Sequence, residues 1–177
     1  MAVFQSIKNF FITEPIVRPE AITAAEPTEY SIKPVTQRRL AEITRLNLRC
    51  FRQGENYSKH TFNYLLNEPR ALSYMAETTE GAIAGFVFVL MNQDGAAHIT
   101  TLGVAPEHRR RGIARRMLQH LDRVLAAKSI STIMLEVRVS NLRAQELYTN
   151  AGYMVVQRVA RYYNNGEDGY LMMKSLV

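Results

Sequence analysis

The sequence predicts a mixed α/β fold whose central sheet is parallel in the middle and antiparallel at both ends. Residues 98–104 follow a two-residue period, and a helical pattern over residues 113–125 leads to a second such segment, residues 132–137. Two strands joined by a helix run parallel. Turn signals at residues 78–81 and 164–166 predict antiparallel hairpins before and after this unit.

The complete pattern is β-α-α-β-β-β-α-β-α-β-β, a mixed sheet of about seven strands with four helices. Pro34 and Pro106 end strands, Thr36 and Asn141 begin helices, and Gly152 ends the last helix. The predicted strands are residues 30–33, 72–76, 83–91, 98–104, 132–137, 153–161 and 170–173. The predicted helices are residues 36–51, 58–66, 113–125 and 141–151.

Length and composition indicate one domain with an N-terminal extension. The chain has 177 residues, of which 47% are hydrophobic and 21% charged, enough to bury a core. We expect residues 30–177 to form the domain. Residues 1–29 are expected to form a helix, with apolar side chains between Val3 and Phe11, and a proline-bearing linker. Such a helix packs on its own domain or on a dimer partner, with membrane-surface contact as the alternative, and it is too short to span a bilayer.

The single cysteine, Cys50, leaves no internal disulfide framework and is typical of a reducing compartment, so we expect a cytoplasmic protein. Its apolar helical surroundings favour a buried structural thiol over a nucleophile. The net charge of +6 favours polyanionic ligands without identifying one. No metal is expected, because no histidine has ligand spacing to acids or cysteines.

The segment after the central strand has the features of an anion-binding turn. The first amides of a helix lack intrahelical acceptors and lie at the positive end of the helix dipole. A glycine at this point lets a diphosphate approach the backbone. A solvated basic turn and a nucleic-acid contact are the alternatives. The residues of the predicted anion site are Arg109, Arg110, Arg111, Gly112, Ile113 and Ala114.

Arg109-x-x-Gly112-x-Ala114 resembles the acetyl-CoA signature of the GNAT acetyltransferase superfamily, Gln/Arg-x-x-Gly-x-Gly/Ala. Longer stretches are similar to N-terminal protein acetyltransferases, both the bacterial ribosomal-protein alanine type and the archaeal and NatA catalytic-subunit type. These stretches are residues 55–57, 135–141, 147–148, 151–153 and 162–172. The resemblance implies a GNAT fold, in which a splay between the parallel fourth and fifth strands holds the pantetheine arm of acetyl-CoA.

Three polar side chains are candidates for acetyl transfer. An attacking amine must lose a proton and the leaving thiolate must receive one. Glu136 is the candidate base, His98 on the neighbouring strand would share an ordered water with it, and Tyr148 is the candidate acid. Positions corresponding to Glu136 and His98 carry polar residues in related enzymes, and the resemblance favours Tyr148 as the acid. The structural alternatives are an outward-facing Glu136, a hydrogen-bonded His98 and a core Tyr148.

Further residues are expected to hold the donor and the acceptor. The backbone of Leu102 and Val104 would pair with the pantetheine amides as an added strand does, and the amide of Val104 would polarise the thioester carbonyl. Asn141 would cap its helix, and the resemblance adds a contact with the CoA arm. Glu55 and Tyr57 would form one wall of the acceptor site, and Tyr162 and Tyr163 the other. The alternatives are packing for Tyr57, a hairpin pair for Tyr162 and Tyr163, and a catalytic, orienting or merely exposed Glu55.

The combined reading is an acetyl-CoA-dependent N-acetyltransferase that acts on the N-terminal α-amine of a protein or peptide by direct transfer in a ternary complex. An α-amine has a pKa of about 7.7 to 8.0, against about 10.4 for lysine, so a modest base is sufficient. The alternatives are transfer to a small-molecule amine or a lysine side chain, and a non-catalytic domain that binds CoA or a partner protein. No nucleic-acid partner is expected, and the protein is a monomer or a homodimer.

Overall fold

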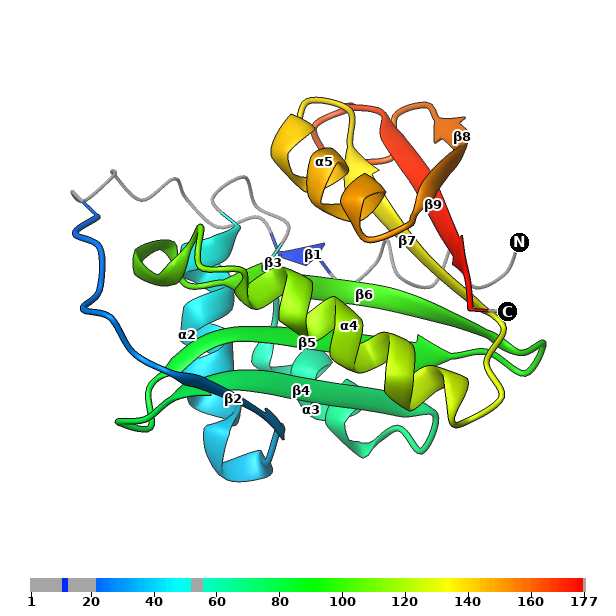
Figure 1. Ribbon diagram of the computed structural model, residues 1–177. Helices are drawn as coiled ribbons and strands as arrows, with labels where there is room; N and C mark the ends of the chain where they lie inside the picture. The colour runs from blue at the N-terminus through cyan, green and yellow to red at the C-terminus, as the bar shows by residue number, and fades with distance from the viewer. Residues whose placement is uncertain (1–10, 13–21, 52–55, 177) are drawn as a thin grey trace.

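The computed structural model describes residues 11–12, 22–51 and 56–176. These residues form a mixed sheet of seven strands in the order β2-β4-β5-β6-β7-β9-β8 (Figure 1). The strands are β2 (Tyr30–Pro34), β4 (Ala71–Thr78), β5 (Ile83–Met91), β6 (Ala96–Val104), β7 (Thr132–Arg138), β8 (Met154–Val159) and β9 (Gly169–Ser175). A second sheet pairs β1 (Phe11–Ile12) with β3 (Asn56–Tyr57).

Helices cover both faces of the main sheet. The α-helices of the described residues are α2 (Leu40–Cys50), α3 (Lys59–Asn67), α4 (Ile113–Ala126) and α5 (Leu142–Asn150). Short 3-10 helices, Gln37–Arg39 and Pro106–His108, precede α2 and α4. Helices α4 and α5 lie on the near face in Figure 1, and α2 and α3 lie on the far face. The sheet is therefore the middle layer of three.

Each helical layer packs against its own apolar core. The core beneath α4 and α5 contains Met117, Leu121 and Ile133, which are fully buried, and the core beneath α2 and α3 contains Ile43 and Phe62. The helical spacing of apolar residues in the sequence accounts for this arrangement, because residues three and four apart share one face of a helix. The two cores hold the sheet rigidly, so side chains at its edges and gaps have fixed positions.

The parallel pair at the centre of the sheet separates along its length. Strand β6 pairs with β7 at only three positions, where Ala96, Ala97 and His98 face Thr132, Ile133 and Met134. Beyond His98, β6 continues to pair with β5, and β7 pairs with β9 along its whole length. The fourth and fifth strands of the sheet order, β6 and β7, therefore diverge after a short parallel contact, as predicted.

Local signals placed most element boundaries correctly. The side chain of Asn141 accepts a hydrogen bond from the amide of Ala144 at 3.1 Å, and Ser58 caps α3 in the same way through Thr61. Thr36 precedes the first 3-10 helix without a side-chain capping bond.

The predicted N-terminal helix lies mostly outside the described residues. At its far end the prediction was wrong, because Phe11 belongs to strand β1, where it pairs with Tyr57 in an antiparallel register. Pairing with β3 supplies strand hydrogen bonds to a segment whose spacing alone suggested a helix.

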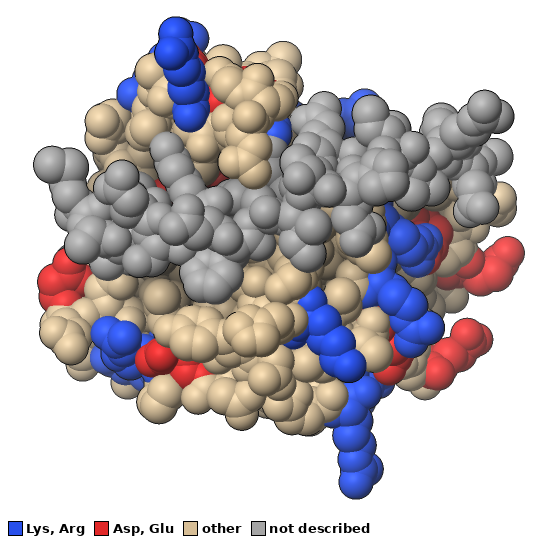
Figure 2. Space-filling model, turned by 180° about the vertical axis from the view of Figure 1, so that it is seen from behind, with Lys and Arg blue, Asp and Glu red and all other residues tan. Residues whose placement is uncertain are grey.

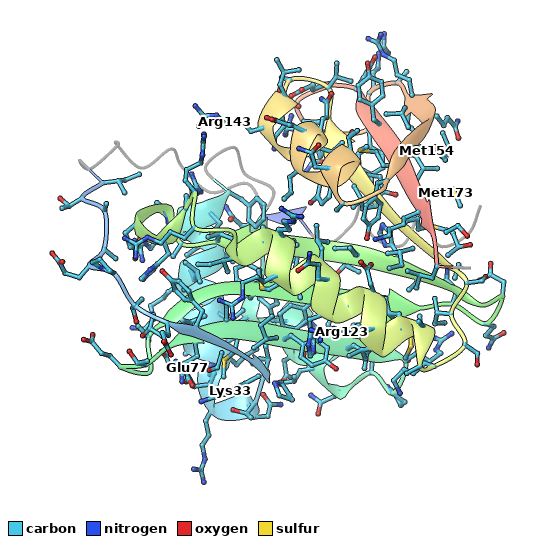
Figure 3. All side chains as sticks on the ribbon, in the orientation of Figure 1. Lys33, Glu77, Arg123, Arg143, Met154 and Met173 are labelled. Atoms are coloured by element: carbon cyan, nitrogen blue, oxygen red, sulfur yellow. The ribbon has the colours of Figure 1, made fainter. Side chains whose placement is uncertain are left out.

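Charged side chains of both signs are interspersed on the face opposite α4 (Figure 2). Some of these charges form links between strands. Lys33 on β2 and Glu77 on β4 lie together at the edge of the sheet (Figure 3), and Arg39 contacts the other carboxylate oxygen of Glu77 at 2.5 Å. These ion pairs tie the first 3-10 helix to the edge of the sheet.

Candidate active site

A cavity of about 410 Å³ opens where β6 and β7 separate. Its walls come from both strands, from α5, from the end of α2 and from the loop between β8 and β9. The cavity is lined by Cys50, Phe51, Tyr57, Ile99, Thr100, Thr101, Leu102, Arg109, Leu135, Glu136, Val137, Arg138, Asn141, Ala144, Leu147, Tyr148, Tyr162 and Tyr163. The separation of two strands thus brings eight of the predicted donor-binding, acceptor-binding and catalytic residues to one concave surface.

His98 and Glu136 form a buried pair across the gap between the two strands, in direct contact rather than through the shared water predicted from the sequence. Nε2 of His98 lies 2.6 Å from Oε2 of Glu136, and the two side chains are 3% and 6% exposed. The register explains the meeting, because His98 is the last residue of β6 to pair with β7. Glu136 lines the cavity, and its Oε1 is buried with no hydrogen-bond partner among the described residues. A buried, unpartnered carboxylate oxygen is suited to accept a proton.

Tyr148 reaches the same cavity from α5. Its side chain is 9% exposed and packs edge-to-face against Tyr153, with 5.7 Å between the ring centroids. Burial raises the pKa of the Tyr148 phenol to about 12, so the hydroxyl keeps its proton throughout the neutral range. A neutral phenol at the edge of a cavity is a hydrogen-bond donor and a source of one proton.

Three further tyrosines line the cavity. Tyr57 is buried beside Phe62, and its hydroxyl donates a hydrogen bond to the Thr100 carbonyl at 2.9 Å. Tyr162 and Tyr163 pack edge-to-face, with ring centroids 5.0 Å apart. Burial, and then the negative charge of Glu136, raise the pKa of Tyr162. Tyr162 and Tyr163 are therefore a packed pair of rings that lines the cavity, and their contact with an acceptor stays a prediction.

Arg138 is a cavity residue that the sequence reasoning missed. It is 7% exposed, and its guanidinium lies 4.0 Å from the centroid of the Tyr163 ring. Its Nη1 donates to Glu167, and the other oxygen of Glu167 accepts the amide of Ser140 at 2.9 Å. Strand alternation is the signal that could have found it, because Arg138 lies two positions after Glu136 on β7 and therefore on the same side of the strand.

The turn before α4 has the predicted geometry of an anion site. Gly112 precedes the helix with a left-handed φ of 73°, and no side chain caps the free amides that follow. A Cβ built at Gly112 would meet no atom within 4 Å, so the approach to these amides is open. Nε of Arg109 donates to the Val104 carbonyl at 3.2 Å, which places this guanidinium between the turn and the cavity. The turn fits a diphosphate at the helix N-terminus.

The remaining predicted residues of this turn have different surroundings. Arg110 is exposed, Ala114 is half-buried, and the side chain of Ile113 is in the core beneath α4. The guanidinium of Arg111 donates to the backbone carbonyls of Ala25 and Glu26. Arg111 therefore directs its side chain to the chain segment that precedes β2.

Strand β6 has an open backbone edge beside the cavity. The carbonyls of Thr100 and Val104 accept hydrogen bonds from side chains, those of Tyr57 and Arg109 respectively, and β7 does not pair with this part of the strand. Residues two apart on a strand direct their backbone groups to the same edge, so the backbone of Leu102 faces the cavity edge as that of Val104 does. An extended ligand can add to such an edge as a further strand. Glu55 lies outside the described residues.

Comparison with known proteins agrees with this geometry. The Acetyltransferase (GNAT) family matches residues 40–153. The chain is 35% identical over 144 residues to the N-alpha-acetyltransferase daf-31 of Caenorhabditis elegans, with coverage of 77% of this chain and 78% of the relative. The chain belongs to the GNAT acetyltransferase family. A second GNAT relative, the N-terminal acetyltransferase A complex catalytic subunit NAA10 of Arabidopsis thaliana, is 35% identical over 154 residues, 82% of this chain and 77% of that protein.

Two solved structures are similar to this fold. The ribosomal-protein-S18-alanine N-acetyltransferase of Escherichia coli is 26% identical to this chain and matches it with a TM-score of 0.76. The match covers 84% of this chain and 94% of that chain. The NatC complex bound to Gag peptide and CoA matches with a TM-score of 0.75 at 24% identity, over 84% of this chain and 99% of that chain, and supports the fold alone. No helix in the described ranges is long and apolar enough to cross a membrane.

Proposed function

We propose that this protein transfers an acetyl group from acetyl-CoA to the N-terminal α-amine of a protein or peptide. The observation that carries the proposal is that Glu136 on β7 and Tyr148 on α5 line one cavity at the point where β6 and β7 separate. The two relatives described above, with 35% identity over most of this chain, are named for α-amine or N-terminal acetylation. Geometry and relatives thus point to the same reaction.

Two elements would hold the donor. The amides at the start of α4, together with Arg109, would bind the diphosphate, and the open edge of β6 at Leu102 would pair with the pantetheine arm. The backbone amide of Val104 would polarise the thioester carbonyl. Asn141, which caps α5, also lines the cavity and would contact the pantetheine arm. These contacts would bring the thioester to Glu136 and Tyr148.

Glu136 would then take up a proton, and Tyr148 would release one. The amine nitrogen attacks the thioester carbonyl, a C–N bond forms, and the C–S bond breaks. The proton lost by the amine goes to Oε1 of Glu136, directly or through a water, and His98 holds Oε2 at 2.6 Å. The Tyr148 hydroxyl gives its proton to the departing thiolate. A neutral phenol is needed for this step, and burial keeps Tyr148 in that form.

The three tyrosines that line the cavity beside Tyr148 favour a peptide acceptor. Tyr57, Tyr162 and Tyr163 would grip the first residues by their backbone, with Glu55 as a further candidate on the same side as Tyr57. We also propose a cytoplasmic location, because the one cysteine of the chain, Cys50, is free and leaves no internal disulfide. The protein would act as a monomer or a homodimer.

The test is acetylation of matched acceptors with acetyl-CoA. Peptides with a free amino terminus should be acetylated faster than the same peptides blocked at that terminus but containing lysine, and faster than polyamines. A library that varies the first residue would then define the preference. Faster modification of lysine or of polyamines would contradict the proposed acceptor. Binding of CoA without modification of any acceptor would instead indicate a non-catalytic domain.

A further inference from the structure

The segment that precedes β2 is fastened to the turn before α4. Residues 22–29, here called the strap, run along the molecule as an extended segment and end at Tyr30 (Figure 1). The guanidinium of Arg111 donates to the carbonyl of Glu26 at 2.8 Å and to that of Ala25. It also donates to the Tyr30 hydroxyl at 3.2 Å. Arg111 therefore contacts the strap at Ala25 and Glu26 and also contacts Tyr30, the residue that follows the strap.

Further contacts hold the strap on both sides of the turn. The amide of Ala25 donates to the carbonyl of Glu107 at 3.0 Å, before the turn, and Arg116 in α4 donates to the carbonyl of Tyr30 at 2.8 Å, after it. The Tyr30 hydroxyl lies 3.0 Å from Nδ1 of His108, and the two rings pack edge-to-face. Burial lowers the pKa of His108, so its neutral ring can accept this hydrogen bond.

The enclosed turn has a backbone that needs external support. Two of its residues, Arg110 and Gly112, have left-handed φ angles of 64° and 73°. For a residue with a side chain this conformation costs free energy, and it persists where surrounding contacts impose it. No side chain caps the start of α4. The contacts that impose the shape come from Arg111, His108 and the strap.

We propose that the strap and Arg111 form a brace that holds the turn before α4 in the shape that presents its amides to the diphosphate of the acetyl donor. Arg111, Tyr30 and His108 are then positioning residues, which act through the backbone of the turn. The inference rests on the proposed function and assigns a role to a segment that precedes residues 40–153, the part matched by the family. It also explains why a guanidinium beside an anion site is directed to carbonyl oxygens.

The test compares Arg111→Gln and Tyr30→Phe, singly and together, with Arg115→Gln as the control. Arg115 is exposed on α4. Its substitution removes one positive charge, as Arg111→Gln does, and leaves the contacts of the strap in place. We expect the KM for acetyl-CoA and the Kd for CoA by calorimetry to rise about tenfold in Arg111→Gln and severalfold in Tyr30→Phe, with kcat within twofold of wild type. Because both variants loosen one brace, the double variant should weaken binding by less than the product of the two effects.

A donor without a diphosphate separates positioning of the turn from general damage. With acetyl-pantetheine, all four variants should have the kcat/KM of the wild-type protein. The brace is wrong if Tyr30→Phe binds CoA as the wild type does while Arg111→Gln binds weakly and with a smaller salt dependence. That result would mean that Arg111 contacts the diphosphate itself. If Arg111→Gln does not fold, Tyr30→Phe and Arg116→Gln decide the question. Failure of the wild-type protein to bind CoA would overturn the proposed function instead.

Discussion

Glu136 and His98 are chemically informative because both are buried and each has an unpartnered atom. Oε1 of Glu136 and Nδ1 of His98 are buried without hydrogen-bond partners among the described residues. An unmet hydrogen bond at a buried polar group costs about 1–3 kcal/mol, so folding alone does not favour this arrangement. Such costs are typical of functional sites. The proposed proton transfer would use the unpartnered oxygen of Glu136.

Tyr148→Phe tests the proposed acid. The phenylalanine keeps the edge-to-face packing on Tyr153 and removes only the hydroxyl, so the structure and the affinity for CoA should be unchanged. We expect kcat to fall by about 10²-fold or more, because general acid catalysis contributes roughly that factor. Steady-state kinetics and calorimetry with CoA measure the two quantities.

The matched control is Tyr153→Phe, which removes a buried hydroxyl from the ring that packs against Tyr148 but does not line the cavity. It should retain wild-type kcat. Undiminished turnover in Tyr148→Phe would remove this residue from the mechanism, and an equal loss in both variants would attribute the effect to packing.

Cys50 should be chemically inert in the folded protein. Burial raises the pKa of its thiol to about 12, above the value of 9.0 for an unperturbed group, and the thiol donates to the Val104 carbonyl at 3.3 Å. At a given pH the thiolate fraction is therefore about 1,000-fold lower than in the unfolded chain, and alkylation by iodoacetamide at pH 8 should be slowed by about this factor.

The same shift predicts a loss of stability at high pH. The unfolded chain loses the Cys50 proton first, so the contribution of the thiol is present below pH 9 and is lost as the pH rises toward the folded value of about 12. Thermal unfolding of the wild type and of Cys50→Ala between about pH 8 and about pH 10, within about one unit either side of the ordinary thiol pKa, should show a steeper decline in the wild type. Parallel curves would show that Cys50 does not contribute.

At the level of elements, the loop between β8 and β9 is positioned by the end of β7. Glu167 in this loop contacts Arg138 and the amide of Ser140, and Arg138 stacks on Tyr163. The amide of Tyr163 also donates to the carbonyl of Glu167 at 3.0 Å. The positions of Tyr162 and Tyr163 in the cavity thus depend on the ion pair between Arg138 and Glu167.

Glu167→Gln should loosen these two tyrosines while leaving donor binding intact. Loss of the negative charge leaves a buried guanidinium with a weaker partner, so we expect the KM of a peptide acceptor to rise about tenfold, equivalent to about 1.4 kcal/mol. The KM for acetyl-CoA should change by less than twofold. Glu146→Gln, an exposed position on α5, is the control. Equal rises in both KM values would show a general disturbance of the cavity instead.

At the scale of the whole molecule, carboxylates with lowered pKa values stabilise the fold above their titration range. Hydrogen bonding to Lys33 lowers the pKa of Glu77, with a further contribution from Arg39, and contacts with Ser140 and Arg138 lower that of Glu167. For a lowered pKa, the contribution is present above the unfolded value, about 4.5, and is lost as the pH falls through the folded value.

The melting temperature should therefore fall as the pH is lowered from about 5 to about 3, and Glu77→Gln should flatten this decline. Thermal unfolding followed by circular dichroism at several pH values measures the effect. Because the Lys33 and Glu77 side chains link β2 to β4 at the edge of the sheet (Figure 3), the variant should also melt lower at pH 7. A wild-type slope in Glu77→Gln would show that the other carboxylates account for the decline.

Most of the fold could be predicted, because strands, helices and caps depend on neighbours in the chain. The alternation of β6 and the side-chain cap at Asn141 are examples. The wrong prediction fell at Phe11, where pairing with a distant segment, β3, overrides the helical spacing. Arg138 was missed because strand alternation gives only the side of β7 on which it lies. Its burial depends on Tyr163 and Glu167, about 25 to 30 residues away, and pairings over such distances leave no local pattern.

The sequence by itself determined the order of the elements, the open turn at Gly112 and the acetyltransferase signature, since each depends on residues within a few positions of one another. The tertiary structure alone decided that β6 and β7 part after His98, that Glu136 meets His98 in the gap, and that Arg111 turns to the strap. These contacts join residues 38 to 86 positions apart, and only the packing of the whole sheet brings them together.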